Sequence, residues 1–292
     1  MKIVFLSGGL GNQMFQFAAA KSLSLIYGHK LKIDPTYYDM YVQNRVFELE
    51  RVFDCQFEIA SDKDLKAILG WKKKIHQSPF WRRLYRKLPG QRNWIVEPHY
   101  HFWPEFLNLS NNCLIEGDWQ SYKYFSDFST QIKDCFKFKQ DDFADHELLQ
   151  RLQSCNSVAI HLRRADYVSN THTLSWHGVC EADYYQAAVQ KLRQAQSNPE
   201  FFVFSDDPIA AREILSGISG LNFVEDPGKR KNQFDMMLMS RCRHNIIANS
   251  TFSWWAAWIN ENPQKMVIAP KRWFAQDKLC DSDLIPPDWQ RL

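Results

Sequence analysis

Apolar runs of strand length alternate with helix-length segments through the second half of the chain. Five runs are mainly apolar: residues 157–163, 201–205, 221–224, 245–248 and 265–269. The segments between them predict four helices, over residues 181–196, 208–218, 233–242 and 252–259. A strand that is apolar on both faces must be buried on both faces, which is typical of a parallel sheet flanked by helices. The pattern predicts a doubly wound α/β unit.

The first half of the chain begins in the same way and then loses the pattern. A strand over residues 2–6, a glycine-rich turn and a helix over residues 12–27 lead to a strand over residues 31–34. No regular element is predicted from there to residues 113–119. We therefore expect two α/β units joined near residues 140–155, with domain bounds of 1–150 and 151–292 and a cleft between the two domains.

Composition and charge narrow the class of protein. The 292 residues are 45% hydrophobic and 24% charged with a net charge of +3, which is too mild to indicate a nucleic-acid-binding protein. Seven cysteines without a C-x-x-C pair indicate free thiols in a reducing compartment. Neither a signal-peptide core nor an apolar stretch of about eighteen residues is present. We expect a cytoplasmic protein.

Two adjacent arginines, Arg163 and Arg164, end the strand that carries His161. Guanidinium groups are permanently charged, multidentate donors, and ligands of open α/β sheets bind at the carboxyl ends of the strands. We expect Arg163 to bind phosphate. The alternative is that an arginine at a strand end simply pairs with a nearby carboxylate such as Asp166, and this alternative is stronger for Arg164 because strand alternation turns the two side chains to opposite sides.

Three further segments with ligand-binding chemistry follow predicted strands. Residues 7–13 (SGGLGNQ) combine a glycine turn with a helix start, where backbone N–H groups are open to a ligand. Asp206 and Asp207 could accept hydrogen bonds from a base edge or a ribose hydroxyl, although Asp207, just before Pro208, is also placed to cap a helix. Residues 249–255 (NSTFSWW) put three hydroxyls at a helix start, which predicts an anion site.

These segments, in this order, resemble the motif set of a known family. Residues 8–16, 117–125, 161–167, 204–208 and 249–255 are similar to the motifs of the α-1,2-fucosyltransferases, glycosyltransferase family 11. The resemblance implies a GT-B type α/β fold with two facing Rossmann-like domains. It also implies inverting transfer of L-fucose from GDP-β-L-fucose to the 2-hydroxyl of a terminal galactoside, in bacterial surface oligosaccharide (O-antigen) synthesis. The domain of residues 1–150 would serve the acceptor and that of residues 151–292 would bind GDP-fucose.

The resemblance also implies roles for individual residues. Arg163 would grip the pyrophosphate, His161 would lie against the nucleotide, and Asp206 would bind guanine or ribose. Asn12 would reach the pyrophosphate or the sugar from the other domain, and together with Arg163 and His161 it forms the expected catalytic set. The remaining expected contacts to the nucleotide sugar are Gly9, Gly11, Asn249, Ser250, Thr251 and Phe252.

The chemistry of the reaction fits these residues. Departure of GDP leaves negative charge on its β-phosphate, and a bidentate arginine with a helix amino terminus can neutralise that charge without a metal. The two Asp-x-Asp triplets, residues 62–64 and 281–283, follow no apolar strand. We therefore predict no metal and no cofactor besides the donor. Asp118 and His161 both remain candidates for the base that takes the acceptor proton.

Residues 71–94 are unusual in composition, with eight Lys or Arg, no Asp or Glu, and five aromatic residues. Such a segment can bind an anionic membrane surface, which a lipid-linked acceptor would require, or it can be a solvated face that covers core aromatics. Trp94, Trp103 and Trp119 are either sugar platforms or core residues.

Two other classes of function explain the sequence less well. A non-catalytic GDP-sugar-binding or carbohydrate-binding module is disfavoured because the four cleft motifs are intact. An RNA-binding protein acting through residues 71–94 would leave the other motifs unexplained, so no nucleic acid partner is predicted.

Overall fold

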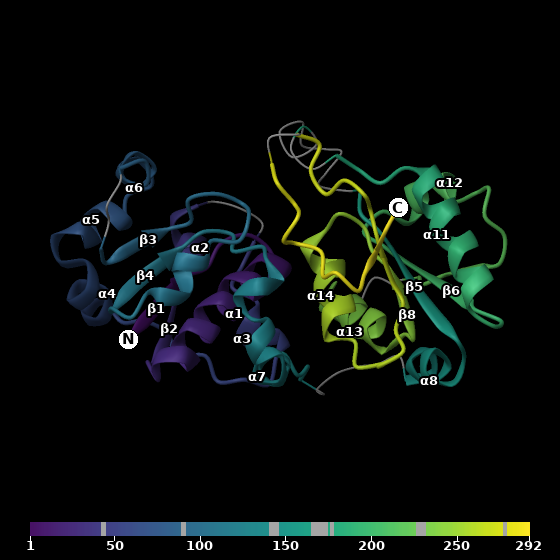
Figure 1. Ribbon diagram of the computed structural model, residues 1–292, viewed down its shortest axis with the longest axis horizontal. Helices are drawn as coiled ribbons and strands as arrows, with labels where there is room; N and C mark the ends of the chain where they lie inside the picture. Colours follow the sequence, from purple (N-terminus) through teal and green to yellow (C-terminus); the bar gives the residue numbers. More distant parts are fainter. Residues whose placement is uncertain are drawn as a thin grey trace. The chain divides into compact units, whose positions relative to one another are not determined.

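The computed structural model describes residues 1–41, 45–88, 92–139, 146–164, 175, 178–225, 232–276 and 279–292. The chain divides into two compact units, Met1–Lys139 with Ser282–Leu284 and Gln140–Asp281 with Ile285–Leu292 (Figure 1). The described strands of each unit form one parallel sheet. The predicted α/β class is therefore confirmed.

The first unit contains a sheet with the strand order β2-β1-β4-β3. Its strands are β1 (Lys2–Phe5), β2 (Leu31–Asp34), β3 (Trp94–Val96) and β4 (Cys113–Glu116). The long helix α1 (Leu10–Tyr27) connects β1 to β2 and ends at Gly28, whose positive φ suits a helix carboxyl terminus. The chain passes from β1 to β2 on one side, whereas β4 and β3 lie on the other side of β1.

The stretch for which no regular element was predicted is in fact largely structured. It holds β3 and the short helices α2 (Tyr37–Met40), α3 (Leu49–Val52), α4 (Asp62–Leu69), α5 (Lys73–His76) and α6 (Pro79–Tyr85). One further helix, α7 (Ser129–Cys135), follows β4. Elements of three to eight residues are too short to show a helical or strand period in the sequence. The prediction of an irregular stretch was therefore wrong.

Two of the three tryptophans considered as sugar platforms belong to the core. Trp94 and Trp119 are fully buried, and the Trp94 indole donates a hydrogen bond of 2.8 Å to the buried carboxylate of Glu116. Trp103 is partly exposed, and its backbone N–H donates to the Tyr124 hydroxyl at 3.0 Å. The platform hypothesis was wrong for Trp94 and Trp119, because an aromatic ring with no exposed face cannot stack on a ligand.

The second unit contains a sheet with the strand order β10-β9-β8-β5-β6-β7. Its strands are β5 (Ser157–Leu162), β6 (Glu200–Ser205), β7 (Leu221–Phe223), β8 (His244–Ile246), β9 (Val267–Ala269) and β10 (Gln290–Arg291). Its helices include α8 (His146–Ser154), α11 (Ala182–Ala195), α12 (Pro208–Ile214), α13 (Asn232–Arg241) and α14 (Thr251–Ile259). The predicted alternation of strands and helices is confirmed, although helix α12 is shorter than expected and β10 was missed.

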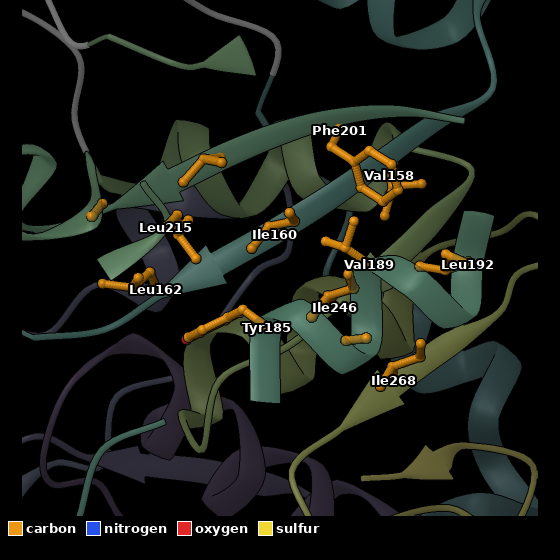
Figure 2. Packing of buried hydrophobic residues seen from close by; sticks show 13 residues of the cluster. Val158, Ile160, Leu162, Tyr185, Val189, Leu192, Phe201, Leu215, Ile246 and Ile268 are labelled. Atoms are coloured by element: carbon orange, nitrogen blue, oxygen red, sulfur yellow. The ribbon is translucent and has the colours of Figure 1, made fainter. Parts of the chain in front are cut away.

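The core of the second unit is built on alternate residues of β5. Figure 2 shows Val158, Ile160 and Leu162 packed with Val189 and Leu192 of α11. Burial of each of these aliphatic side chains contributes about 1.5–3 kcal/mol to folding stability, so the contact with α11 holds β5 firmly in place. The alternation of side chains turns the residues between them, among them His161, to the opposite face of the sheet.

No helix in the described part of the chain combines the length and the apolar character that a bilayer-crossing helix requires.

Candidate active site

The strand order of the second unit brings two of the predicted motifs to one place. The chain leaves β5 through α11 to β6 on one side, whereas β8 pairs with β5 on the other side. Ligands of open α/β sheets bind at such a switch point, at the carboxyl ends of the strands. Arg163 follows β5 directly, and residues 247–250 connect β8 to α14. Both segments therefore lie at the same edge of the sheet.

Arg163 and Asp206 form an ion pair across the ends of β5 and β6. The Arg163 Nη1 atom lies 3.2 Å from Asp206 Oδ2, and the Arg164 backbone N–H donates to Asp206 Oδ1 at 2.9 Å. The two paired side chains keep 20% and 18% exposure, so both remain accessible to a ligand. The Arg164 side chain lies 3.6 Å from Glu181, while Asp166 falls outside the described residues. Asp206 thus holds both the guanidinium of Arg163 and the backbone beside it.

His161 is buried beside this pair. Its side chain is 4% exposed, and its Nδ1 atom has no hydrogen-bond partner among the described residues. Burial and the nearby Arg163 charge lower the pKa of His161 to about 3. The imidazole is therefore neutral at physiological pH. Its Nδ1 atom can donate or accept one hydrogen bond to a ligand, but the ring is a weak base.

Helix α14 presents its amino terminus at the same edge. Ser250 is the N-cap residue, but its side chain makes no capping hydrogen bond, and the Ser253 hydroxyl donates back to the Ser250 carbonyl at 3.3 Å. The Phe252 ring lies 5.7 Å from the His161 ring. A helix start without a side-chain cap and with a partial positive charge favours an anion. Thr251 is the first residue of this helix.

Asn249 is more buried than the sequence suggested. It is 3% exposed, and its side-chain amide donates to the carbonyls of Gly178 at 3.4 Å and Trp273 at 3.3 Å. These contacts connect the segment before α14 to the segments that contain Gly178 and Trp273. The expected contact between Asn249 and the nucleotide stays a prediction.

The glycine turn of the first unit is held in shape by its own motif. Gly8 adopts a φ of +75°, a conformation that favours glycine. Its carbonyl accepts hydrogen bonds from the Tyr38 hydroxyl at 3.0 Å and from the Gln13 amide at 3.2 Å. Gln16 accepts from the Ser7 N–H at 2.9 Å. Gln13 and Gln16 are therefore structural clamps of the turn.

A second arginine, which the sequence reasoning missed, lies against this turn. A Cβ atom on Gly9 would lie 2.3 Å from Nη1 of Arg45, so a larger residue at position 9 would displace this guanidinium group. Gly9 is also the N-cap of α1 and offers no capping side chain. Asn12 accepts a weak hydrogen bond of 3.4 Å from Gln120, and Gly11 is buried in the first turn of the helix. Arg45 stands alone in an irregular stretch, so no sequence signal identified it.

Both Asp-x-Asp triplets have structural partners. Asp64 caps the start of α4 together with Ser61, and it pairs with Lys32 at 2.9 Å. Asp281 pairs with Arg291 at 2.6 Å, and Asp283 pairs with Lys123. Within the described ranges, no three His, Cys, Asp or Glu side chains gather as metal ligands would.

Comparison with known proteins agrees with this geometry. The sequence profile of glycosyl transferase family 11 matches residues 1–292. The chain is 32% identical to an alpha-1,2-colitosyltransferase of Escherichia coli, over 98% of this chain and 97% of the relative. It is 31% identical to the O-antigen biosynthesis glycosyltransferase WbnK of Escherichia coli, over 98% and 99% of the two chains. A galactoside alpha-(1,2)-fucosyltransferase 1 of Leontocebus fuscicollis is 25% identical over 88% of this chain and 64% of its own length.

Solved structures of fucosyltransferases share the fold. An Arabidopsis thaliana FUT1 variant in complex with GDP matches 98% of this chain and 74% of its own, with a TM-score of 0.53 and 13% identity. The fucosyltransferase NodZ of Bradyrhizobium matches 87% and 90% of the two chains, with a TM-score of 0.50 and 13% identity. The expected GT-B type fold is thereby confirmed. With the family profile matching along its whole length, the chain belongs to glycosyl transferase family 11 and is a glycosyltransferase.

Proposed function

We propose that this enzyme transfers L-fucose from GDP-β-L-fucose to the 2-hydroxyl of a terminal galactoside, with inversion at the anomeric carbon. One observation carries the proposal: Arg163, held by Asp206, lies at the switch point where α14 begins without a side-chain cap. This arrangement offers a charged fork and a helix amino terminus to one anion. A sugar diphosphate is the donor class that such a site fits.

The same residues stabilise the charge that develops during transfer. As the bond between the fucose anomeric carbon and the β-phosphate oxygen breaks, its electrons stay on GDP. Arg163 donates two hydrogen bonds to phosphate oxygens, and the first N–H groups of α14 add their partial positive charge. The hydroxyls of Ser250 and Thr251 are placed at that helix start to bind the phosphates. No metal ion is part of this scheme.

Binding of the rest of the donor is assigned to the neighbouring residues. Asp206 accepts a hydrogen bond from guanine or ribose through lone pairs of its carboxylate that the contact with Arg163 does not use. His161 and Phe252 provide an apolar, neutral wall against the nucleotide. From the first unit, Gly9, Gly11 and Asn12 serve the pyrophosphate or the sugar.

Colitose is the alternative donor sugar, because one relative is a colitosyltransferase at 32% identity. Colitose lacks the 3-hydroxyl of fucose, so the two donors differ by one polar group. The test is incubation of the purified protein with GDP-fucose or GDP-colitose and a panel of galactosides, followed by NMR assignment of the new linkage. We expect a fucosyl α-1,2 linkage to galactose. Transfer from GDP-colitose alone would identify the other donor, and a linkage to another hydroxyl would contradict the acceptor assignment.

We also propose that the acceptor is a lipid-linked oligosaccharide, reached by peripheral contact with an anionic membrane. The support lies in helix α6 and the residues around it, which lie at the margin of the first unit in Figure 1. Five large apolar side chains are exposed there: Trp71 (72%), Phe80 (65%), Trp81 (58%), Leu84 (46%) and Leu88 (57%). We call these five residues, with Lys74, Arg83 and Lys87, the basic aromatic surface.

The structure reduces the number of cations that this surface offers. Arg82 is buried and bound to Glu116 at 2.9 Å, Arg86 pairs with the same carboxylate at 3.0 Å, and Lys73 pairs with Asp62. Lys74, Arg83 and Lys87 pair with no carboxylate in the described ranges. At about 1 kcal/mol for each cation near an anionic surface, these three contribute roughly 3 kcal/mol, and interfacial tryptophans add to that.

A further inference from the structure

The sheet of the first unit also has a switch point, and the residues after β4 at this point have no role in the proposed function so far. In the order β2-β1-β4-β3, this switch point lies between β1 and β4. The glycine turn follows β1, and residues 117–120 follow β4. The hydrogen bond between Gln120 and Asn12 links the two segments at 3.4 Å. Ligands are expected at this edge for the same reason as in the second unit.

The segment after β4 is wrapped around the carboxyl group of Glu97. Glu97 follows β3, and its oxygens accept from the backbone N–H groups of Asp118 at 2.7 Å and of Trp119 at 3.1 Å. Trp119 reaches this position with a φ of +53°, which is unfavourable for a bulky residue. A Cβ atom on Gly117 would lie 2.4 Å from the Glu97 Cβ atom. Strained backbone of this kind persists where the surroundings over-determine it, and it clusters at functional sites.

The wrapping places a second carboxyl group, that of Asp118, beside the first. Asp118 is half-buried, and its side chain is hydrogen-bonded to the Tyr100 hydroxyl. Burial raises the pKa of Asp118, against the opposing charge of Arg86 at the end of α6. Burial and the neighbouring Asp118 charge raise the pKa of Glu97 to about 8. Two carboxyl groups this close do not both ionise easily, so the pair retains a proton to a higher pH than isolated carboxyls would.

The two carboxyl groups are held differently. Glu97 uses both oxygens to bind backbone N–H groups, so it is fixed in place. Asp118 is held through Tyr100 and remains partly exposed at the sheet edge. A base must be accessible and must have a proton affinity close to the working pH. Glu97 already uses both oxygens to hold backbone N–H groups, and His161 is buried with a strongly lowered pKa, so Asp118 is the best-placed base of the three.

We propose that Asp118 is the catalytic base that accepts the proton of the acceptor hydroxyl, with Glu97 as the residue that positions it. This inference rests on the proposed function. In the step, the acceptor oxygen forms a bond to the anomeric carbon while the bond from that carbon to the β-phosphate oxygen breaks. The electron pair of the broken bond leaves on GDP, and the proton of the hydroxyl passes to the Asp118 carboxylate.

The test compares Asp118→Asn with Asp127→Asn, a matched change at an exposed aspartate of the same unit. General-base catalysis typically contributes about 10²–10⁴-fold. We expect Asp118→Asn to lower kcat by at least about 100-fold while the dissociation constant of GDP, measured by calorimetry, stays unchanged. Asp127→Asn should match the wild type. If Asp118→Asn transfers sugar within about threefold of the wild type, Asp118 is not the base.

Two further measurements keep the inference testable if Asp118→Asn does not fold. The kcat/KM of the wild type should fall on acidification with a midpoint above about 3.9, the pKa of an ordinary aspartate, because the raised pKa of Asp118 leaves it protonated sooner. A profile that stays flat down to that pH would overturn the assignment. Glu97→Gln keeps an oxygen for the backbone N–H groups and should stay within about tenfold, whereas Glu97→Ala should not; equal losses in both would overturn the positioning role.

Failure of the proposed function gives a different result. If fucose is not the sugar or galactose not the acceptor, the wild type itself forms no fucosyl-galactose linkage in the first assay. The variants are then measured with the donor and acceptor that the wild type uses, and the comparison between Asp118→Asn and Asp127→Asn still decides the question.

Discussion

Replacing Arg163 by lysine tests the assignment of the donor site most directly. Lysine keeps the positive charge but presents a point ammonium in place of a planar fork, so it cannot hold two phosphate oxygens in a fixed geometry. The contact that is lost acts on the charge of the departing phosphate. Removing one preorganised transition-state contact of this kind typically costs about 2.7–4 kcal/mol, or roughly 10²–10³ in kcat.

The structure allows this loss to be separated from a loss of stability. Arg163 and Asp206 are 3.2 Å apart and about one-fifth exposed, so their pair is partly screened by solvent. Exposed ion pairs contribute about 0–1 kcal/mol to folding, and lysine can still pair with Asp206. We therefore expect a melting temperature close to that of the wild type together with the large loss in kcat.

The assay is initial-rate release of GDP over a range of donor concentrations, with Arg164→Lys as the matched control. The Arg164 side chain pairs with Glu181, and its contact to Asp206 is made by the backbone, which the substitution leaves intact. Arg164→Lys should stay within a few-fold of the wild type. If Arg163→Lys also stays within a few-fold, or if both variants lose activity equally, the reasoning about the phosphate fork is refuted.

Three more predictions follow from the same site and from the basic aromatic surface. Asp206→Ala should raise the KM for GDP-fucose more than it lowers kcat, and an unchanged KM with equal losses in kcat and kcat/KM would contradict a role in donor binding. Transfer should continue in excess EDTA, and activity that is abolished by EDTA and restored by Mg²⁺ or Mn²⁺ would refute the metal-free scheme. Sedimentation with anionic vesicles should recover the protein at low salt and lose it at high salt. Replacing Lys74, Arg83 and Lys87 by Gln should weaken that binding while transfer to a small soluble galactoside is retained, and a wild type that ignores anionic vesicles would leave the surface as an ordinary solvated face.

The sequence predicted the second unit well because its information is local. A mainly apolar strand such as β5 can be recognised from the sequence as buried, and its end can be located. Arg163, which follows that end, could therefore be identified as a ligand-binding candidate. Asp207 could be read in the same way, and its side chain caps α12 by accepting from the Ala210 N–H at 3.0 Å. In both cases the deciding contact lies within a few residues of the motif.

The first unit was predicted poorly because its information is carried by contacts between distant residues. Arg82 belongs to the basic segment in sequence, but Glu116, 34 residues away, binds it inside the unit. Arg45 likewise contacts Gly9, and Glu97 contacts Gly117. Each of these residues lies far along the chain from the glycine that it contacts. Short helices without a visible period could not indicate these contacts in advance.

The proposed inverting transfer makes opposite electrostatic demands on its two reacting groups. The leaving phosphate requires a cation, whereas the incoming hydroxyl requires a carboxylate that holds a proton well. Opposite charges 4 Å apart interact by about 4 kcal/mol near a protein surface, which corresponds to roughly three pKa units. A base placed against Arg163 would therefore lose most of its proton affinity, and Asp206, paired with Arg163, is suited to binding rather than to proton transfer. Asp118 follows β4 of the first unit, where burial raises its pKa despite the nearby charge of Arg86.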